Sequence, residues 1–212
     1  MKHRFSALAF ALCSVLSVPS LATTYDDMLR AIEIDDQRSV AELLKRGFDV
    51  DSVNPKGESL LMLAVRSGKV AVVKTILTAR PKVNARNAHG ESALMLAAIN
   101  GRTEIVRMLL EAGAEVNHSG WTPLMYAATN NHTDAARLLL ARGAQVNAAA
   151  QNGTSALMMA ARNGHLPMVL LLLEHGADVN YTSAFGYNAL NTALDRGRRD
   201  VADVLIRAGA RR

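Results

Sequence analysis

The most informative part of the chain reads Gly120-Trp121-Thr122-Pro123-Leu124-Met125-Tyr126-Ala127-Ala128. Gly120 fits a tight turn, because glycine adopts positive φ without steric cost. Thr122 can cap a helix with its hydroxyl group. Pro123 suits the first helical position, where a missing N–H costs nothing. The run therefore predicts a turn that leads directly into a helix.

The same order of turn glycine, cap and helix occurs four more times along the chain. The five turn glycines are Gly57, Gly90, Gly120, Gly153 and Gly186, and their spacings are 33, 30, 33 and 33 residues. A period of this size indicates stacked helical repeats, in which each unit buries its apolar face against its neighbours.

A second helix is predicted in each unit. Counted from one alanine of the first helix, apolar residues recur nine, twelve and thirteen residues later and so share one helix face. A glycine sixteen residues later is expected to end this helix in the left-handed conformation. Arg80 replaces that glycine once and precedes Pro81, so we expect this loop to bend differently. The reference alanines are Ala31, Ala64, Ala97, Ala127, Ala160 and Ala193, which gives six units.

This repeat resembles the ankyrin repeat, whose signature is Thr-Pro-Leu-His-x-Ala-Ala. Residues 101–117 are similar to the second half of that repeat, and the resemblance spans roughly residues 25–210. Methionine replaces the signature histidine at Met62, Met95, Met125 and Met158. The resemblance implies an all-α, ankyrin-repeat solenoid of about six helix-turn-helix units with short β-hairpin-like fingers. It implies a single domain, residues 23–212, with units at about 24–53, 54–86, 87–118, 119–149, 150–182 and 183–212.

One connection between units is shorter than the others. The segment between Val116 and Gly120 has three residues fewer than the equivalent segments elsewhere. In the ankyrin family this segment is a projecting finger, and His118-Ser119 is too short to form a full one. We therefore predict a notch in the row of fingers between the third and fourth units.

The start of the chain has the pattern of a secretory signal peptide. Lys2 and Arg4 precede an apolar run over residues 5–18, and Ser20-Leu21-Ala22 places small residues before a cut. This order predicts a signal over residues 1–22, cleaved between Ala22 and Thr23. The apolar run is shorter than the roughly 20 residues that cross a bilayer. We expect an exported protein, foremost periplasmic, with secretion as the alternative and no membrane span in the mature chain.

Cleavage would also change the charge and the cysteine content. Lys plus Arg would fall from 24 to 22 against 19 acidic residues, so the formal net charge would fall from +5 to +3. This mild charge argues against a nucleic-acid partner. Cys13 would leave with the signal, so we expect no disulfide in the mature chain. We also expect a monomer.

The sequence contains no arrangement typical of a catalytic, cofactor or metal site, and we predict a protein that is not an enzyme. His89 and His118 fall at neighbouring finger tips, which leaves a surface metal site as the alternative. His132 and His165 are equivalent positions of stacked helices, about 8–10 Å apart, and so share a metal poorly. The repeated methionines predict core filling, with an oxidation-sensitive ladder as the alternative.

The resemblance implies that a protein partner meets the finger tips and the exposed side of the inner helices, which form a concave face. Residues directly after the turn glycines vary between units, so we expect Glu58 there to be dispensable for stability. Trp, Tyr and Arg are enriched in interface hot spots. Tyr126 and Phe185 could instead pack between units. The candidate partner-binding residues are Arg66, Arg86, His89, Trp121, Tyr126, Asn130, Arg162, Tyr181, Phe185, Tyr187 and Arg196.

The leading interpretation is a non-enzymatic protein–protein interaction module of the bacterial cell envelope. Three alternatives remain open at this point. One is a secreted effector that binds a host protein. The others are an accessory protein that supports a periplasmic catalase and an immunity protein against a toxin. The sequence does not name the partner.

Overall fold

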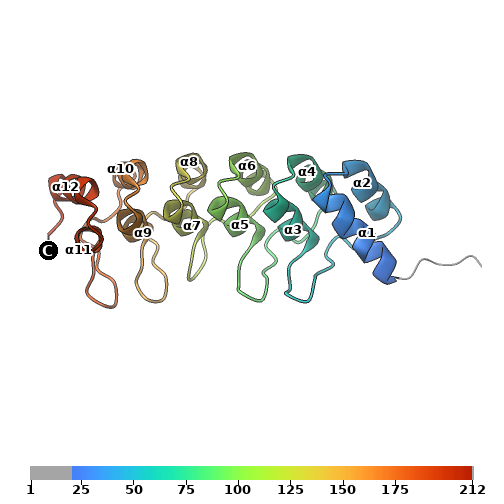
Figure 1. Ribbon diagram of the computed structural model, residues 1–212, viewed down its shortest axis with the longest axis horizontal. Helices are drawn as coiled ribbons and strands as arrows, with labels where there is room; N and C mark the ends of the chain where they lie inside the picture. Colours follow the sequence, from blue (N-terminus) through green and yellow to red (C-terminus); the bar gives the residue numbers. More distant parts are fainter. Residues whose placement is uncertain (1–20, 212) are drawn as a thin grey trace, which may run out of the picture.

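The computed structural model describes residues 21–211, with side chains from Thr24 onward. Apart from Leu21 and Ala22, the predicted signal peptide lies outside the described residues. Twelve helices follow one another in this part of the chain (Figure 1). They are α1 Leu21–Glu33, α2 Gln37–Lys45, α3 Leu60–Ser67, α4 Val70–Thr78, α5 Ala93–Ile99, α6 Thr103–Glu111, α7 Pro123–Thr129, α8 Thr133–Ala141, α9 Ala156–Asn163, α10 Leu166–Glu174, α11 Ala189–Asp195 and α12 Arg199–Arg207. Within residues 21–211, no helix has both the length and the apolar character needed to cross a bilayer.

The helices form six antiparallel pairs stacked in one row. The odd-numbered inner helices pack on one another in chain order, from α1 to α11, and the even-numbered outer helices do the same from α2 to α12. Figure 1 shows the outer helices in one layer, the inner helices in the next, and the connecting fingers projecting beyond them. The predicted all-α solenoid of six helix-turn-helix units is confirmed.

Five of the six inner helices, α3, α5, α7, α9 and α11, start where the sequence places a cap. The side-chain oxygen of each cap residue accepts a hydrogen bond from the backbone N–H three residues later, at 2.9–3.3 Å. This bond satisfies a backbone donor that has no partner inside the helix. The five caps are Ser59, Ser92, Thr122, Ser155 and Asn188.

Small residues and methionines fill the space between units. The reference alanines are at most 4% exposed, and their short side chains let neighbouring inner helices approach closely. The repeated methionines are buried as well, with exposures of 1%, 2%, 0% and 5% for Met62, Met95, Met125 and Met158. Their flexible side chains fit an irregular core, which agrees with the predicted core-filling role.

Polar side chains also join successive units. The Nε2 atom of His132 lies 3.1 Å from the carbonyl oxygen of Ile99, and that of His165 lies 2.9 Å from the carbonyl oxygen of Thr129. Each carbonyl lies at the end of the inner helix of the preceding unit, α5 or α7. Carbonyls at a helix end have no intrahelical partner. The two histidines therefore stabilise the junctions between units.

The loop at Arg80 bends as the equivalent glycine loops do, so the prediction of a different bend is wrong. Arg80 adopts the left-handed conformation with φ of 55°, and its N–H donates to the carbonyl of Leu77 at 3.1 Å. The loop has one hydrogen bond fewer than its counterparts, because Pro81 has no N–H. The equivalent Ala114 donates to the carbonyl of Leu109 at 2.9 Å.

Four fingers share a backbone hydrogen bond across their base, and the short connection before α7 lacks it. The bond joins the N–H at the start of the finger to the carbonyl of the residue before the cap, at 2.8–3.0 Å. Within residues 116–122 no such bond is present, and Figure 1 shows a shorter loop before α7. The predicted notch is confirmed. The closing pairs are Asn54 with Glu58, Asn87 with Glu91, Ala150 with Thr154 and Ser183 with Tyr187.

Candidate functional site

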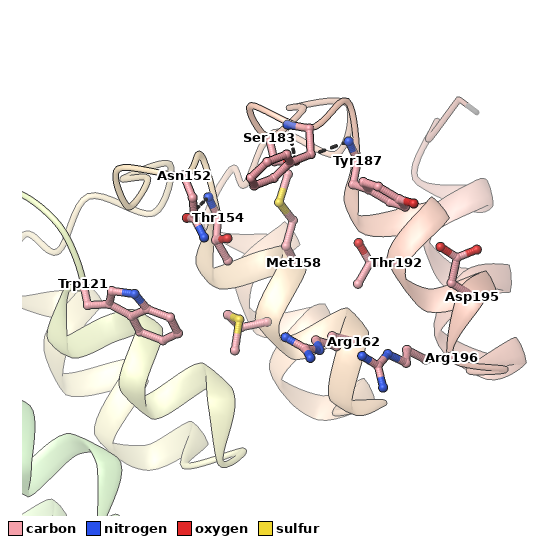
Figure 2. A pocket seen from close by; sticks show the side chains of 12 residues that line it. Trp121, Asn152, Thr154, Met158, Arg162, Ser183, Tyr187, Thr192, Asp195 and Arg196 are labelled. Atoms are coloured by element: carbon pink, nitrogen blue, oxygen red, sulfur yellow. Dashed lines mark hydrogen bonds between the residues drawn. The ribbon is translucent and has the colours of Figure 1, made fainter.

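A hollow of about 430 Å³ lies over the inner helices of the last three units (Figure 2). We call it the aromatic cleft. Its walls come from α9, α11, two fingers and the short connection before α7. The residues that line it are Trp121, Asn152, Thr154, Met158, Met159, Arg162, Ser183, Phe185, Tyr187, Thr192, Asp195 and Arg196.

Three large aromatic side chains stand at the rim of the aromatic cleft in contact with solvent. Trp121 is 36% exposed, Tyr187 50% and Phe185 75%. The last finger positions two of them, because the Ser183 hydroxyl accepts hydrogen bonds from the N–H groups of Phe185 and Tyr187 at 3.4 and 3.2 Å. Trp121 rests on Tyr126, with ring centroids 5.4 Å apart. Rigid aromatic side chains held in this way provide contact area at low entropic cost.

The floor and one end of the aromatic cleft differ in chemistry. Met158 and Met159 form an apolar floor and are only 5% and 8% exposed. Arg162 of α9 and Arg196, directly after α11, lie at one end and are exposed. Figure 2 shows both guanidinium groups at this end, with the Asp195 carboxylate pointing away from them. The cleft can therefore hold an apolar group and an anion together.

A second hollow, of about 480 Å³, occupies the notch. It lies between the fingers before α5 and α9, and His89, His118, Trp121 and Tyr126 contribute to its lining. Trp121 and Asn152 line both hollows. The notch and the aromatic cleft are therefore neighbours that meet at the Trp121 side chain.

Arg86 and His118 interact at the edge of the notch. Nη1 of Arg86 lies 2.6 Å from Nε2 of His118, and Nη2 lies 3.8 Å from a Glu115 carboxylate oxygen. Arginine only donates hydrogen bonds, so this Nε2 acts as the acceptor and the imidazole is neutral. Burial, followed by the Arg86 charge, lowers the pKa of His118. The Nε2 atom of His118 is thus occupied by the hydrogen bond from Arg86. In the described residues, no group of three or more His, Cys, Asp or Glu side chains is placed to hold a metal ion.

The structure brings most of the candidate partner-binding residues together and separates three from the rest. Trp121, Arg162, Phe185, Tyr187 and Arg196 line the aromatic cleft, while His89, Tyr126 and, beside them, Arg86 belong to the notch. The three residues apart from these hollows are Arg66, Asn130 and Tyr181.

The three separated residues have structural contacts. Asn130 donates from Nδ2 to the carbonyl of Ile99 at 2.7 Å and so helps to join two units. Tyr181 is half-buried and packs against the hydrophobic core. Arg66 forms an ion pair with Glu58. Each of the three side chains therefore has a contact within the protein, and none of them needs a partner protein to explain its position.

The expectation that Glu58 is dispensable does not fit its surroundings. Glu58 is only 5% exposed. Its carboxylate pairs with Arg66 and accepts a hydrogen bond from Nδ2 of Asn54 at 2.8 Å. The variability of this position between units gave no sign of burial. The ion pair needs a glutamate here and an arginine eight residues later, and only the second unit has both.

Sequence reasoning also missed the methionine floor and the finger-tip residue Asn152. Met158 appeared only as a member of the core series, and it is indeed almost fully buried. Its part in the aromatic cleft depends on the open space above it. The one available signal was Met159, which gives this unit alone two adjacent methionines.

Comparison with known proteins identifies the repeat. A family model described as ankyrin repeats (3 copies) matches residues 28–119, 76–150, 115–183 and 146–211. Among solved structures, the human ASB11 ankyrin repeat domain has 25% sequence identity and a TM-score of 0.81, covering 87% of this chain and 84% of that chain. A chain from the complex of a predatory endopeptidase of Bdellovibrio bacteriovorus with an immunity protein has 29% identity and a TM-score of 0.77, covering 85% of this chain and 97% of that chain. No curated protein matches the chain.

The overlapping family matches extend over most of the chain, from residue 28 to residue 211. Ankyrin repeats in general act as non-enzymatic scaffolds for protein–protein interaction. The helix pairs, the fingers and the cap residues described above follow the same repeat. The chain belongs to the ankyrin repeat family.

Proposed function

We propose that this protein is a non-enzymatic binding module of the bacterial cell envelope that holds a protein partner in the aromatic cleft. The observation that carries the proposal is the set of three exposed aromatic side chains and two arginines around an apolar floor. Side chains of these types dominate the binding energy of protein interfaces. A concave, mostly preformed site of this kind is also typical of binding sites in general.

The envelope location rests on the start of the sequence. Lys2 and Arg4, the apolar run over residues 5–18 and the small residues before Thr23 support export through a cleaved signal. The proposal is therefore a periplasmic protein, with secretion as the alternative destination.

Capture from the envelope tests the proposed function. The tagged protein is expressed in its own host, cross-linked in intact cells and purified with whatever it holds. We expect Trp121→Ala and Tyr187→Ala each to weaken capture by about 2 kcal/mol, roughly 30-fold in affinity. Leu170→Ala, which removes a side chain that is 50% exposed on the outer helix α10, serves as the matched control.

Capture tests the site only if the variants are folded. The melting temperature of each variant is therefore first compared with that of the wild-type protein. Trp121 and Tyr187 are both exposed, and we expect their loss to change stability little. A partner that stays bound to Trp121→Ala and Tyr187→Ala as firmly as to Leu170→Ala would contradict the proposed site.

A second candidate function is that of an immunity protein against an envelope toxin. It is favoured by the likeness, at 29% identity and over 97% of that chain, to a structure of a predatory endopeptidase in complex with an immunity protein. If this function applies, the captured partner is an enzyme, and adding the purified protein in equimolar amount inhibits it. Trp121→Ala relieves that inhibition. A partner whose activity is unchanged by binding excludes this candidate.

A further inference from the structure

Two cations lie in the aromatic cleft without an acidic partner. Arg162 and Arg196 are exposed, and within residues 24–211 neither guanidinium group forms an ion pair. A guanidinium group stays protonated in proteins. Two such groups at one end of a hollow favour an anion between them, and their planar donor geometry matches a carboxylate.

The acidic groups nearby leave this positive charge in place. Asp195 also lines the aromatic cleft, but its carboxylate points away from both guanidinium groups in Figure 2. Among the described residues, Asp195 is the only acidic residue in the lining of the cleft. An acidic group of a ligand is therefore attracted most strongly to the arginine end of the cleft.

The opposite part of the aromatic cleft suits a large apolar side chain. Met158 and Met159 form its floor, and Trp121 and Phe185 stand exposed above it. Methionine and aromatic side chains adapt to apolar groups of differing shape. An apolar side chain there would remove exposed aromatic surface from water while a neighbouring carboxylate reaches the arginines.

The notch provides a way out of the cleft for a chain that continues. Trp121 of the short connection before α7 and Asn152 of the finger before α9 line both hollows. The short connection has no closing backbone hydrogen bond, and it leaves a gap between the fingers before α5 and α9. An extended segment can thus pass from the arginines over Trp121 and leave between the neighbouring fingers. A folded, convex partner surface would leave the notch unfilled.

We infer that the occupant of the aromatic cleft is an extended, acidic segment of the partner protein that carries one large apolar side chain. Its carboxylate lies between Arg162 and Arg196, its apolar side chain lies on Met159 beside Trp121, and its backbone leaves through the notch. This inference rests on the proposed function of the cleft as the partner site.

Selection from a phage-displayed library of random dodecapeptides tests the inference without knowledge of the partner. The full mature protein is the target. The counter-target is the triple variant Trp121→Ala/Arg162→Gln/Arg196→Gln, whose melting temperature is first shown to equal that of the wild type. We expect enriched peptides to combine acidic residues with one bulky apolar residue. Each single arginine-to-glutamine change should weaken an enriched synthetic peptide about tenfold, and Leu170→Ala should not weaken it.

Three results of the selection would overturn the inference. They are enrichment of basic or uncharged peptides, binding that is equally strong to the arginine variants, and no enrichment over the triple variant. Partner capture separates this failure from failure of the proposed function. If Trp121→Ala abolishes capture while Arg162→Gln/Arg196→Gln does not, the site stands and the acidic segment is wrong. If neither variant affects capture, the site itself is wrong.

Discussion

Replacing Glu58 by alanine should destabilise the protein, although this position varies between units. The carboxylate of Glu58 is almost fully buried and has two partners, Arg66 and Asn54. Truncation leaves the Asn54 amide without its acceptor and removes the anion beside Arg66. The finger's backbone bond, from the N–H of Asn54 to the carbonyl of Glu58, remains in the variant. The expected loss therefore comes from the side chain alone.

The magnitude follows from the two contacts. A hydrogen bond to a charged acceptor contributes about 1.5 kcal/mol or more. The Arg66 side chain is 50% exposed, so solvent screening limits the ion pair to about 0.5–1 kcal/mol. We expect Glu58→Ala to lower the free energy of unfolding by about 2 kcal/mol, or the melting temperature by roughly 4–8 °C for a domain of this size.

Denaturant unfolding with a matched control measures this loss. Glu91 occupies the equivalent position in the next unit and accepts the same asparagine bond at 2.8 Å, but Ile99 stands where the second unit has Arg66. Glu91→Ala should therefore cost less than Glu58→Ala. A double-mutant cycle of Glu58→Ala and Arg66→Ala should give a coupling energy of about 0.5–1 kcal/mol. Equal, negligible losses for both glutamates would refute the reasoning.

Three further predictions concern stability and export. Leu139→Ala in α8 should cost about 2–5 kcal/mol, because Leu139 is fully buried and α8 packs between α6 and α10. Leu205→Ala in α12 should mainly fray the last unit, because α12 packs only on α10 among the outer helices. Equal global losses by denaturant unfolding would contradict this difference. Arg80→Gly should stabilise the protein by about 1 kcal/mol, since glycine adopts the left-handed conformation without strain, and a lower melting temperature would disprove it. N-terminal sequencing of the protein purified from the envelope should begin at Thr23, and an intact Met1 would disprove cleavage.

The regular spacing of the sequence predicted the fold well because each unit repeats the same pair of helices with similar turns and core positions. A cap such as Thr122 and the proline after it determine where an inner helix begins, and the reference alanines determine which face meets the next unit. These constraints depend on neighbours within one unit and the next, so they are visible in one sequence. The short segment before Trp121 predicted the notch for the same reason.

The parts that sequence reasoning missed depend on individual side chains of different units. The buried carboxylate of Glu58 pairs with Arg66, and this pair is not part of the repeat pattern. Arg80 adopts the left-handed conformation that glycine takes at the equivalent positions of other units, and its residue type does not predict this conformation. The continuity of the aromatic cleft with the notch depends on Trp121 and Asn152, which come from different fingers. No periodic signal marks either of them as part of a shared surface.

The central claim is that the partner covers the aromatic cleft, and the tryptophan content of the chain allows a direct measurement. Trp121 is the only tryptophan, so protein grown with fluorotryptophan gives one fluorine resonance, which reports on the aromatic cleft where it meets the notch. Addition of the unlabelled captured partner should shift and broaden this resonance, because the 36% exposed indole becomes covered. A resonance that stays unchanged while the two proteins co-elute as a complex would contradict the account.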